Sequence, residues 1–198
     1  MSIGTYGSLG SAVSEWLGRN GDTDIAGRID DIIALHEQRM YYGAAEVPGV
    51  MPQMPPLRIR EMETVNASFS ITAATVAQPS GFLELIEATL NSASQPMDIV
   101  HEAVIESYNT QSLGGCKLMA VSGTNFRFKD TPTSDSLTLR YFQKLTTPSA
   151  SNTSNAITTG FPSLYLNGCL MQAAIYTGDW ESAQRYGALY VSEVSGLN

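Results

Sequence analysis

The chain has 198 residues, of which 43% are hydrophobic and only 15% are charged, and its formal net charge is −8. This apolar content is sufficient for a folded core, and so little charge excludes a largely disordered chain. The acidic balance also argues against a protein that coats nucleic acid, because such proteins neutralise phosphates with Lys and Arg. The length suits one domain, or one domain that carries a sizeable insertion.

Cysteine usage and hydropathy exclude further classes of protein. The two cysteines, Cys116 and Cys169, belong to no CxxC motif or Cys/His cluster, so no zinc site is predicted. The first positive residue is Arg19, so the N-terminus does not resemble a signal peptide. No run reaches the ~18 apolar residues of a membrane span. We therefore expect two reduced thiols and no association with a membrane.

Residues 5–42 contain two apolar patterns with helical spacing, separated by the glycines of "GRNGD". Thr5 is a plausible N-cap for the first helix, and Asp24 for the second. Together they predict an αα-hairpin. The expected apolar positions are Tyr6, Leu9, Val13, Trp16 and Leu17, then Ile25, Ile29, Ile32, Ile33, His36 and Met40.

Residues 45–56, "AEVPGVMPQMPP", contain four prolines, which exclude a helix. We expect an exposed, extended loop with Met51 and Met54 as its apolar tips. The following "LRIREME" places Arg58 and Arg60 on one strand face if the segment is extended. These arginines are interpreted either as ordinary surface charge or as a partner-facing patch.

The middle of the chain is predicted to be rich in strands. In residues 66–73, "NASFSITA", apolar and polar residues alternate with the period of a half-buried strand. Residues 117–130 predict a hairpin with its turn at 122–125. Residues 136–145 give the clearest strand, with Leu137, Leu139 and Tyr141 on one face. Residues 82–91 fit a strand or a helix, 94–100 a short strand, and 101–108 a short helix.

The small polar residues of 146–160 predict a loop, and two helices follow it. Pro162 fits the first turn of one helix, and Asp179 fits the N-cap position of the other. The side chains expected to point inward from the last helix are Trp180, Ala183, Tyr186, Leu189 and Tyr190.

These elements predict an α+β fold in which the N- and C-terminal helix pairs form a four-helix bundle and an antiparallel β lobe is inserted between them. Each helix pair has a wide apolar stripe that must be buried, and packing the pairs together satisfies both. The expected parts are a helical hairpin (1–45), a Pro-rich loop (46–56), a β-rich lobe (57–146), and a loop with the second hairpin (147–198).

Few residues offer catalytic chemistry. Cys169 stands among aliphatic residues with no His, Asp or Arg near it in sequence, so we interpret it as a core cysteine rather than a nucleophile. His36 lies on an apolar helix face, as a core histidine would. His101 begins "HEAVIE", which lacks the second His of the HExxH metal motif. The glycines before Cys116 lack phosphate-loop spacing and predict a turn. We expect no catalytic residue, cofactor or metal.

The order of the segments resembles a known family. The segments that contribute to the likeness are 5–42, 57–64, 78–91, 96–108, 117–132 and 137–145, and its most specific part is "FPSLYLNGCLMQAAIYTGDWESAQRYGALY" at the C-terminus. There a helix that begins aromatic-Pro-x-Leu-Tyr precedes a helix that begins near "DWESAQRY". This order resembles the head–tail adaptor proteins of tailed bacteriophages, also called connector or tail tubular proteins. The long insertion at 45–56 departs from the family pattern.

The resemblance implies a structural virion protein of the phage neck, assembled in the host cytoplasm. Such adaptors form a ring, usually of twelve copies, under the portal protein. They dock the tail nozzle or tail tube, and DNA passes through the lumen without sequence-specific binding. A lumen of like charge would let DNA slide, which fits the acidic composition.

Under this reading the residues expected to meet a partner are Pro48, Met51, Met54, Pro55, Arg58 and Arg60. Methionines in a proline-rich loop are adaptable apolar groups that suit an imperfect fit between rings. The alternatives are another phage neck or minor tail component, a small soluble hydrolase with a Ser or Cys nucleophile, and a bacterial four-helix regulatory module.

Overall fold

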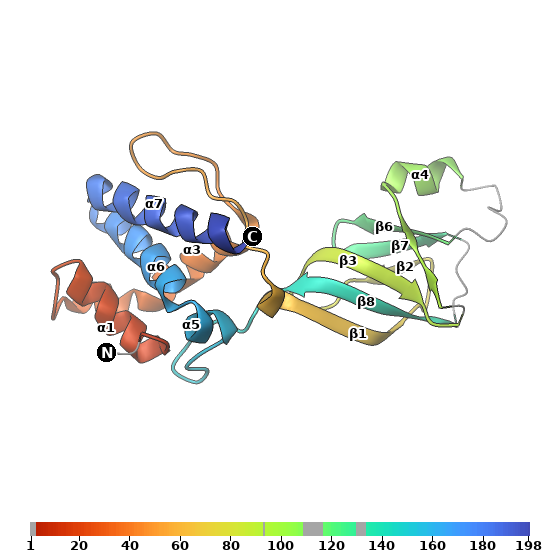
Figure 1. The fold of residues 1–198 in the computed structure, drawn as a ribbon, viewed down its shortest axis with the longest axis horizontal. Helices are drawn as coiled ribbons and strands as arrows, with labels where there is room; N and C mark the ends of the chain where they lie inside the picture. Colours follow the sequence, from red (N-terminus) through yellow and green to blue (C-terminus); the bar gives the residue numbers. More distant parts are fainter. Residues whose placement is uncertain (1–2, 93, 109–116, 130–133) are drawn as a thin grey trace. The chain divides into compact units, whose positions relative to one another are not determined.

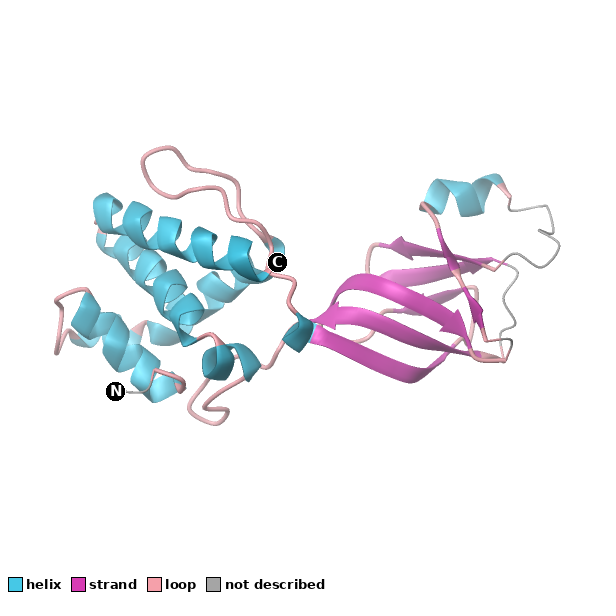
Figure 2. Ribbon diagram, in the orientation of Figure 1, coloured by secondary structure: helices cyan, strands magenta, loops and turns pink. Residues whose placement is uncertain are grey.

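The structure is a computed structural model that describes residues 3–92, 94–108, 117–129 and 134–198. It divides into a helical unit, Met1–Glu61 with Leu145–Asn198, and a β unit, Met62–Lys144. Figure 2 shows the helices of the first unit and the two small sheets of the second. The chain therefore has a mixed α+β fold in which the N- and C-terminal helices pack together and the sheets are inserted between them in sequence. The turn predicted at Cys116 lies outside the described residues.

Helix α6 is the central element of the helical unit, because α1, α3 and α7 all pack on it. Figure 1 shows α6 between α1 and α7. All side chains from Leu164 to Ala174 are buried, as expected for a helix enclosed by neighbours. The helices of this unit are α1 (Tyr6–Trp16), α2 (Thr23–Gly27), α3 (Ile29–Tyr42), α5 (Ala156–Gly160), α6 (Pro162–Thr177) and α7 (Trp180–Leu197).

The predicted helix starts at Thr5, Pro162 and Asp179 are confirmed. The Ser8 N–H donates to Thr5 Oγ1, and the Ser8 hydroxyl accepts from the Thr5 N–H at 3.1 Å, which forms a capping box. Pro162 occupies the first turn of α6. The Asp179 carboxylate accepts from the Ser182 N–H at 3.1 Å and caps α7.

Two helix predictions need correction. The pattern from Asp24 to Met40 is two helices rather than one, since the chain turns at Arg28 (φ −106°, ψ 6°) after the poor helix former Gly27. The cap of α2 is Asp22, whose carboxylate accepts from the Asp24 N–H at 2.9 Å. Residues 146–160 are also not all loop, because Asn155 caps the short helix α5.

The β unit contains two four-stranded sheets. The pairs are antiparallel except β5–β6, which is parallel. The prediction of an antiparallel lobe needs this correction, and the reason is α4 (Glu102–Ser107), which lies in the crossover between those two strands. The first sheet has the order β1 (Glu63–Ser70), β8 (Ser136–Gln143), β3 (Phe82–Leu90), β4 (Gln95–Pro96), and the second β2 (Thr75–Ala77), β7 (Asn125–Lys129), β6 (Leu118–Ser122), β5 (Asp98–Ile99).

The core of the β unit agrees with the sequence pattern. Leu137, Leu139 and Tyr141 of β8 are buried, as predicted, and pack with Phe126 of β7. Residues 82–91, which fitted either element, form strand β3 because they pair with β8. The predicted hairpin turn is also confirmed, since β6 and β7 pair up to Ser122 and Asn125 across two turn residues.

Candidate protein-interaction surfaces

The loop after α3 projects as two antiparallel segments that lie close together. Isolated β-bridges join Ala44 to Met54 and Val47 to Met51. Gly43 permits the sharp start of the loop, because its φ is 73° and an added Cβ would lie 2.7 Å from the Met54 carbonyl oxygen. Backbone hydrogen bonds between the bridged residues join the two sides of the loop.

The expectation that Met51 and Met54 are exposed tips is wrong. Met51 is 9% exposed and Met54 is 2% exposed, because the base of the loop packs on the helices. The Arg39 guanidinium donates to Met51 Sδ at 3.1 Å. Pro52 fills the space beside Gly187 of α7, where an added Cβ would lie 2.7 Å from Pro52 Cδ.

The true tip of the loop consists of Val47, Pro48 and Gly49, which are all exposed. Val47 is 43% exposed, so an apolar side chain projects from a packed base. Pro55, nearer the helices, is half-buried.

Arg58 and Arg60 do not share a strand face, because Arg60 begins a 3₁₀ turn, η1 (Arg60–Met62), before β1. Arg58 Nη1 donates to the carbonyl oxygens of Tyr41 and Leu57 at 3.0 and 2.8 Å. The carbonyl of Tyr41 belongs to the last turn of α3, so Arg58 satisfies a helix C-terminus. Arg60 is exposed.

Three potentially reactive groups, His36, Glu37 and Cys169, lie in the core of the helical unit. Their exposed fractions are 1%, 6% and 0%, so solvent does not reach them. Burial lowers the pKa of His36 to about 3, with a smaller contribution from the charge of Arg39. Burial, and then the charge of Glu37, raise the pKa of Cys169. Cys169 is thus a neutral core thiol, which disfavours a thiolate nucleophile.

Glu37 is instead the centre of a structural network. Its carboxylate accepts hydrogen bonds from the hydroxyls of Tyr165 and Thr147, both at 2.5 Å. The Asn155 amide donates to the Tyr165 hydroxyl at 2.9 Å. The network therefore fastens residues 147–155, which follow the β unit, to helices α3 and α6. Such a buried carboxylate is stable only with partners of this kind.

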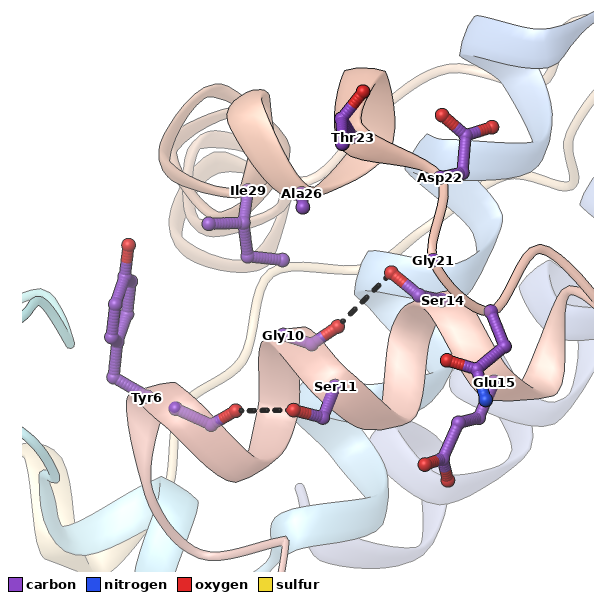
Figure 3. A pocket seen from close by; sticks show the side chains of 12 residues that line it. Tyr6, Gly10, Ser11, Ser14, Glu15, Gly21, Asp22, Thr23, Ala26 and Ile29 are labelled. Atoms are coloured by element: carbon purple, nitrogen blue, oxygen red, sulfur yellow. Dashed lines mark hydrogen bonds between the residues drawn. The ribbon is translucent and has the colours of Figure 1, made fainter.

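A groove of about 490 Å³ lies between α1 and α2. Figure 3 shows its wall on α1, where the hydroxyls of Ser11 and Ser14 donate to the carbonyl oxygens of Gly7 and Gly10 at 3.1 and 3.4 Å. Glu15 also lines the groove. We refer to this feature as the α1–α2 groove, and its remaining lining residues are Tyr6, Asn20, Gly21, Asp22, Thr23, Ala26 and Ile29.

Both tryptophans of the chain are largely exposed, which the sequence pattern did not predict. Trp16 is 59% exposed and Trp180 is 49% exposed, and Leu189, also expected to point inward, is 49% exposed. Ala183, Tyr186 and Tyr190 are buried as predicted. Trp16 and Trp180 occupy the last and first positions of their helices, where no further turn covers them. Their position at the predicted helix ends was the signal in the sequence that could have indicated this exposure.

Two features were absent from the described residues: a cluster of metal-ligating side chains and a membrane-spanning helix. Within residues 3–92, 94–108, 117–129 and 134–198, no group of three His, Cys, Asp or Glu side chains is placed to hold a metal ion. No helix in those same segments is long and apolar enough to cross a bilayer.

His36, Glu37 and Cys169 are thus buried, whereas both tryptophans lie at the surface, where they are available for contacts. Comparison with known families then places the molecule. The chain belongs to the SU10 adaptor protein family, which matches residues 4–197, and so to the phage head–tail adaptors. The family assignment suggested by the order of segments is therefore confirmed, and it implies a structural rather than an enzymatic role. No functionally curated protein matches the chain.

Proposed function

We propose that this chain forms a ring, of twelve copies, between the portal protein and the tail nozzle or tail tube, with DNA passing through the lumen. The match to an adaptor family over residues 4–197 carries this proposal. A closed ring of identical chains requires each copy to use two different surfaces, one for each neighbour. The helical unit offers several exposed apolar features that suit such contacts.

The loop of residues 44–54 is our candidate for contact with another ring. Its base is fixed on the helices through the buried Met51 and Met54, and its exposed tip presents Val47 and Pro48. A preformed loop binds with a smaller loss of conformational entropy than a disordered one. Pro55 and the exposed Arg60 extend this candidate surface, whereas Arg58 serves mainly to satisfy helix α3.

The net charge of −8 supports passage of DNA without tight binding. A channel lined with carboxylates repels phosphates, so few counterions are released and little affinity results. This part of the proposal fails if the channel-facing side of the assembled ring is basic.

Native mass spectrometry of the full chain mixed with purified portal protein tests the proposal. We expect a complex that contains one portal ring and about twelve copies of this chain. A chain that remains monomeric and ignores the portal contradicts the proposal. A ring that binds the tail protein but not the portal would instead identify another neck component.

The burial of Cys169 disfavours a hydrolase that would use this thiol as its nucleophile. A thiol with no exposed surface and a raised pKa is neither ionised nor accessible to a substrate. Cys169 therefore supports packing, in agreement with its place in the central helix.

A further inference from the structure

A second groove, of about 390 Å³, lies between α3 and α6. Leu35 of α3 and Tyr176 of α6 line it and are 49% and 50% exposed. Partly exposed apolar side chains that gather at a hollow are typical of a surface that binds another protein. We refer to this feature as the α3–α6 groove, and its remaining lining residues are Arg28, Asp31, Ile32, Ala34 and Gln172.

The charged residues at one end of the α3–α6 groove are paired within the chain. Arg28 Nη1 lies 3.6 Å from Asp31 Oδ2, and Arg28 Nε lies 4.0 Å from Asp24 Oδ1. The Tyr176 hydroxyl donates to the Asp24 carboxylate at 2.8 Å. These groups therefore do not require a charged partner from another protein.

Arg39 lies at the other end of the groove, toward the C-terminus of α3. It follows Leu35 by four residues and therefore lies on the same face of the helix. When the Gln172 amide is oriented with its oxygen toward Arg39, this oxygen accepts from Arg39 Nε and Nη1 at 3.3 and 2.7 Å. Arg39 Nη1 also donates to Met51 Sδ. Because Gln172 lines the groove and Met51 lies at the base of the loop of residues 44–54, Arg39 connects these two features.

Arg39 has no counter-charge in the part of the chain that the structure describes. No carboxylate there forms an ion pair with it, and its Nη2 has no hydrogen-bond partner among those residues. Nη2 is not an enclosed polar atom either, so it is accessible from outside. Burial lowers the pKa of this half-buried arginine, because desolvation disfavours the charged form. A carboxylate at Nη2 would offset this cost, since hydrogen bonds between arginine and carboxylate are strong.

We propose that the α3–α6 groove binds an acidic segment of a partner ring, whose carboxylate pairs with Arg39 Nη2 and whose neighbouring apolar side chain packs between Leu35 and Tyr176. The partner is the ring that the loop of residues 44–54 contacts, because Arg39 joins the groove to the base of that loop. DNA is a poorer ligand, since a single free cation cannot neutralise a run of phosphates. This inference rests on the ring proposed above and names the chemistry of its partner.

Binding assays with charge variants test this pairing. Arg39→Met removes the charge but keeps a long aliphatic side chain, so the affinity for the partner ring should fall at least about tenfold. Arg39→Lys keeps a cation and should lose less than Arg39→Met. The matched control is Arg28→Met at the same groove, which should change the affinity less than about twofold, because Arg28 is paired within the chain. Sedimentation measures the binding, and circular dichroism checks that each variant is folded.

Photo-cross-linking locates the partner segment. The photoreactive residue p-benzoylphenylalanine replaces Leu35 in the full chain assembled with purified portal and tail rings, and mass spectrometry identifies the linked peptides. We expect links to the ring whose binding depends on Val47 at the loop tip, with an Asp or Glu close to the linked site. Changing that acidic residue to Arg should weaken binding, and combining this change with Arg39→Glu should restore it. The matched control places the same residue at Leu189, which is also 49% exposed, and should not link to that segment.

The outcomes separate this inference from the proposed function. If rings form between portal and tail but Leu35 links only to a second copy or to the ring that does not depend on Val47, the adaptor function stands and the assigned site is wrong. The same holds if Arg39→Met binds like the wild type, if Arg28→Met loses as much affinity, or if the exchanged charges do not restore binding. If no ring forms under any condition, both the adaptor ring and this site are wrong.

Discussion

Gly168 and His36 share one small space in the helical core. A Cβ added at Gly168 would lie 2.0 Å from the His36 ring, and that ring packs edge-on against Tyr165 and Tyr190, with centroids 5.2 and 5.3 Å away. The glycine is therefore required for close packing of α3 on α6, and the ring cannot move aside without disturbing two tyrosines.

Gly168→Ala should destabilise the helical unit by at least ~1–3 kcal/mol, the usual cost of overpacking a core. Chemical denaturation followed by circular dichroism measures the change. Gly196→Ala is the matched control, because nothing lies within 4 Å of a Cβ there and alanine favours a helix. An alanine at 168 that leaves the midpoint unchanged would disprove the packing described.

His36 should make folding sensitive to acid. Its ring nitrogens have no hydrogen-bond partner among the described residues, and its pKa is about 3 in the folded chain but ~6.5 when unfolded. The unfolded state therefore binds the extra proton between these values, and stability falls as the pH drops from ~6.5 toward 3, by up to about 1.4 kcal/mol per pH unit.

The His36→Phe variant should lose this part of the pH dependence of the unfolding free energy, since phenylalanine cannot bind a proton. Its unfolding free energy is compared with that of the wild type between pH 4 and pH 7. Other groups near the ring, including Glu37 and Arg39, are common to both chains. His101→Asn, at the exposed second histidine, is the matched control. An identical slope in His36→Phe would show that His36 is not buried neutral.

At the scale of elements, Tyr41 fastens the segment that leaves the β unit. Its hydroxyl accepts from the Leu145 N–H at 3.1 Å. Tyr41→Phe should speed hydrogen exchange of the Leu145 amide by roughly fivefold, which corresponds to one net hydrogen bond of ~1 kcal/mol. NMR exchange measures this amide directly. Tyr42→Phe, at a side chain 61% exposed, should leave the Leu145 rate unchanged; equal effects of both would argue against this hydrogen bond.

The projecting loop provides another test at this scale. Val47→Ser should weaken binding to portal or tail rings several-fold, because an exposed apolar tip is lost, while the buried Met51 and Met54 keep the monomer folded. Sedimentation of the complexes measures the binding. Val121→Ser is the matched control, since Val121 is also 43% exposed. Unchanged binding of Val47→Ser would remove the loop from the candidate surfaces.

Many of the helices and strands could be predicted from the sequence, and the exceptions have physical reasons. The caps at Thr5 and Asp179 and the alternation in β8 are local signals, and they were predicted. The break at Arg28 was missed because helical spacing continues through it. The sequence predicts exposed Met51 and Met54 because proline indicates a loop, but only tertiary packing decides whether the base of a loop is buried.

The candidate surfaces were predicted least well, because they depend on which side chains the fold leaves uncovered. Trp180 and Leu189 match the apolar period of α7 and yet are about half exposed. The α1–α2 groove has no sequence motif at all. The family resemblance, which depends on the order of many elements, was by contrast visible in the sequence.

At the scale of the whole molecule, we propose that the acidic charge and the exposed apolar side chains both serve assembly of the ring. In the proposed ring, a net charge of −8 per chain should prevent tight binding of DNA, and the exposed apolar side chains should provide contacts between proteins.

A single-particle reconstruction of the phage neck tests most directly whether the chain forms the proposed ring between portal and tail. We predict a ring of this chain between portal and tail, with carboxylates facing the DNA. A reconstruction in which the neck lacks this chain, or in which the chain contacts neither the portal nor the tail, would contradict this proposal.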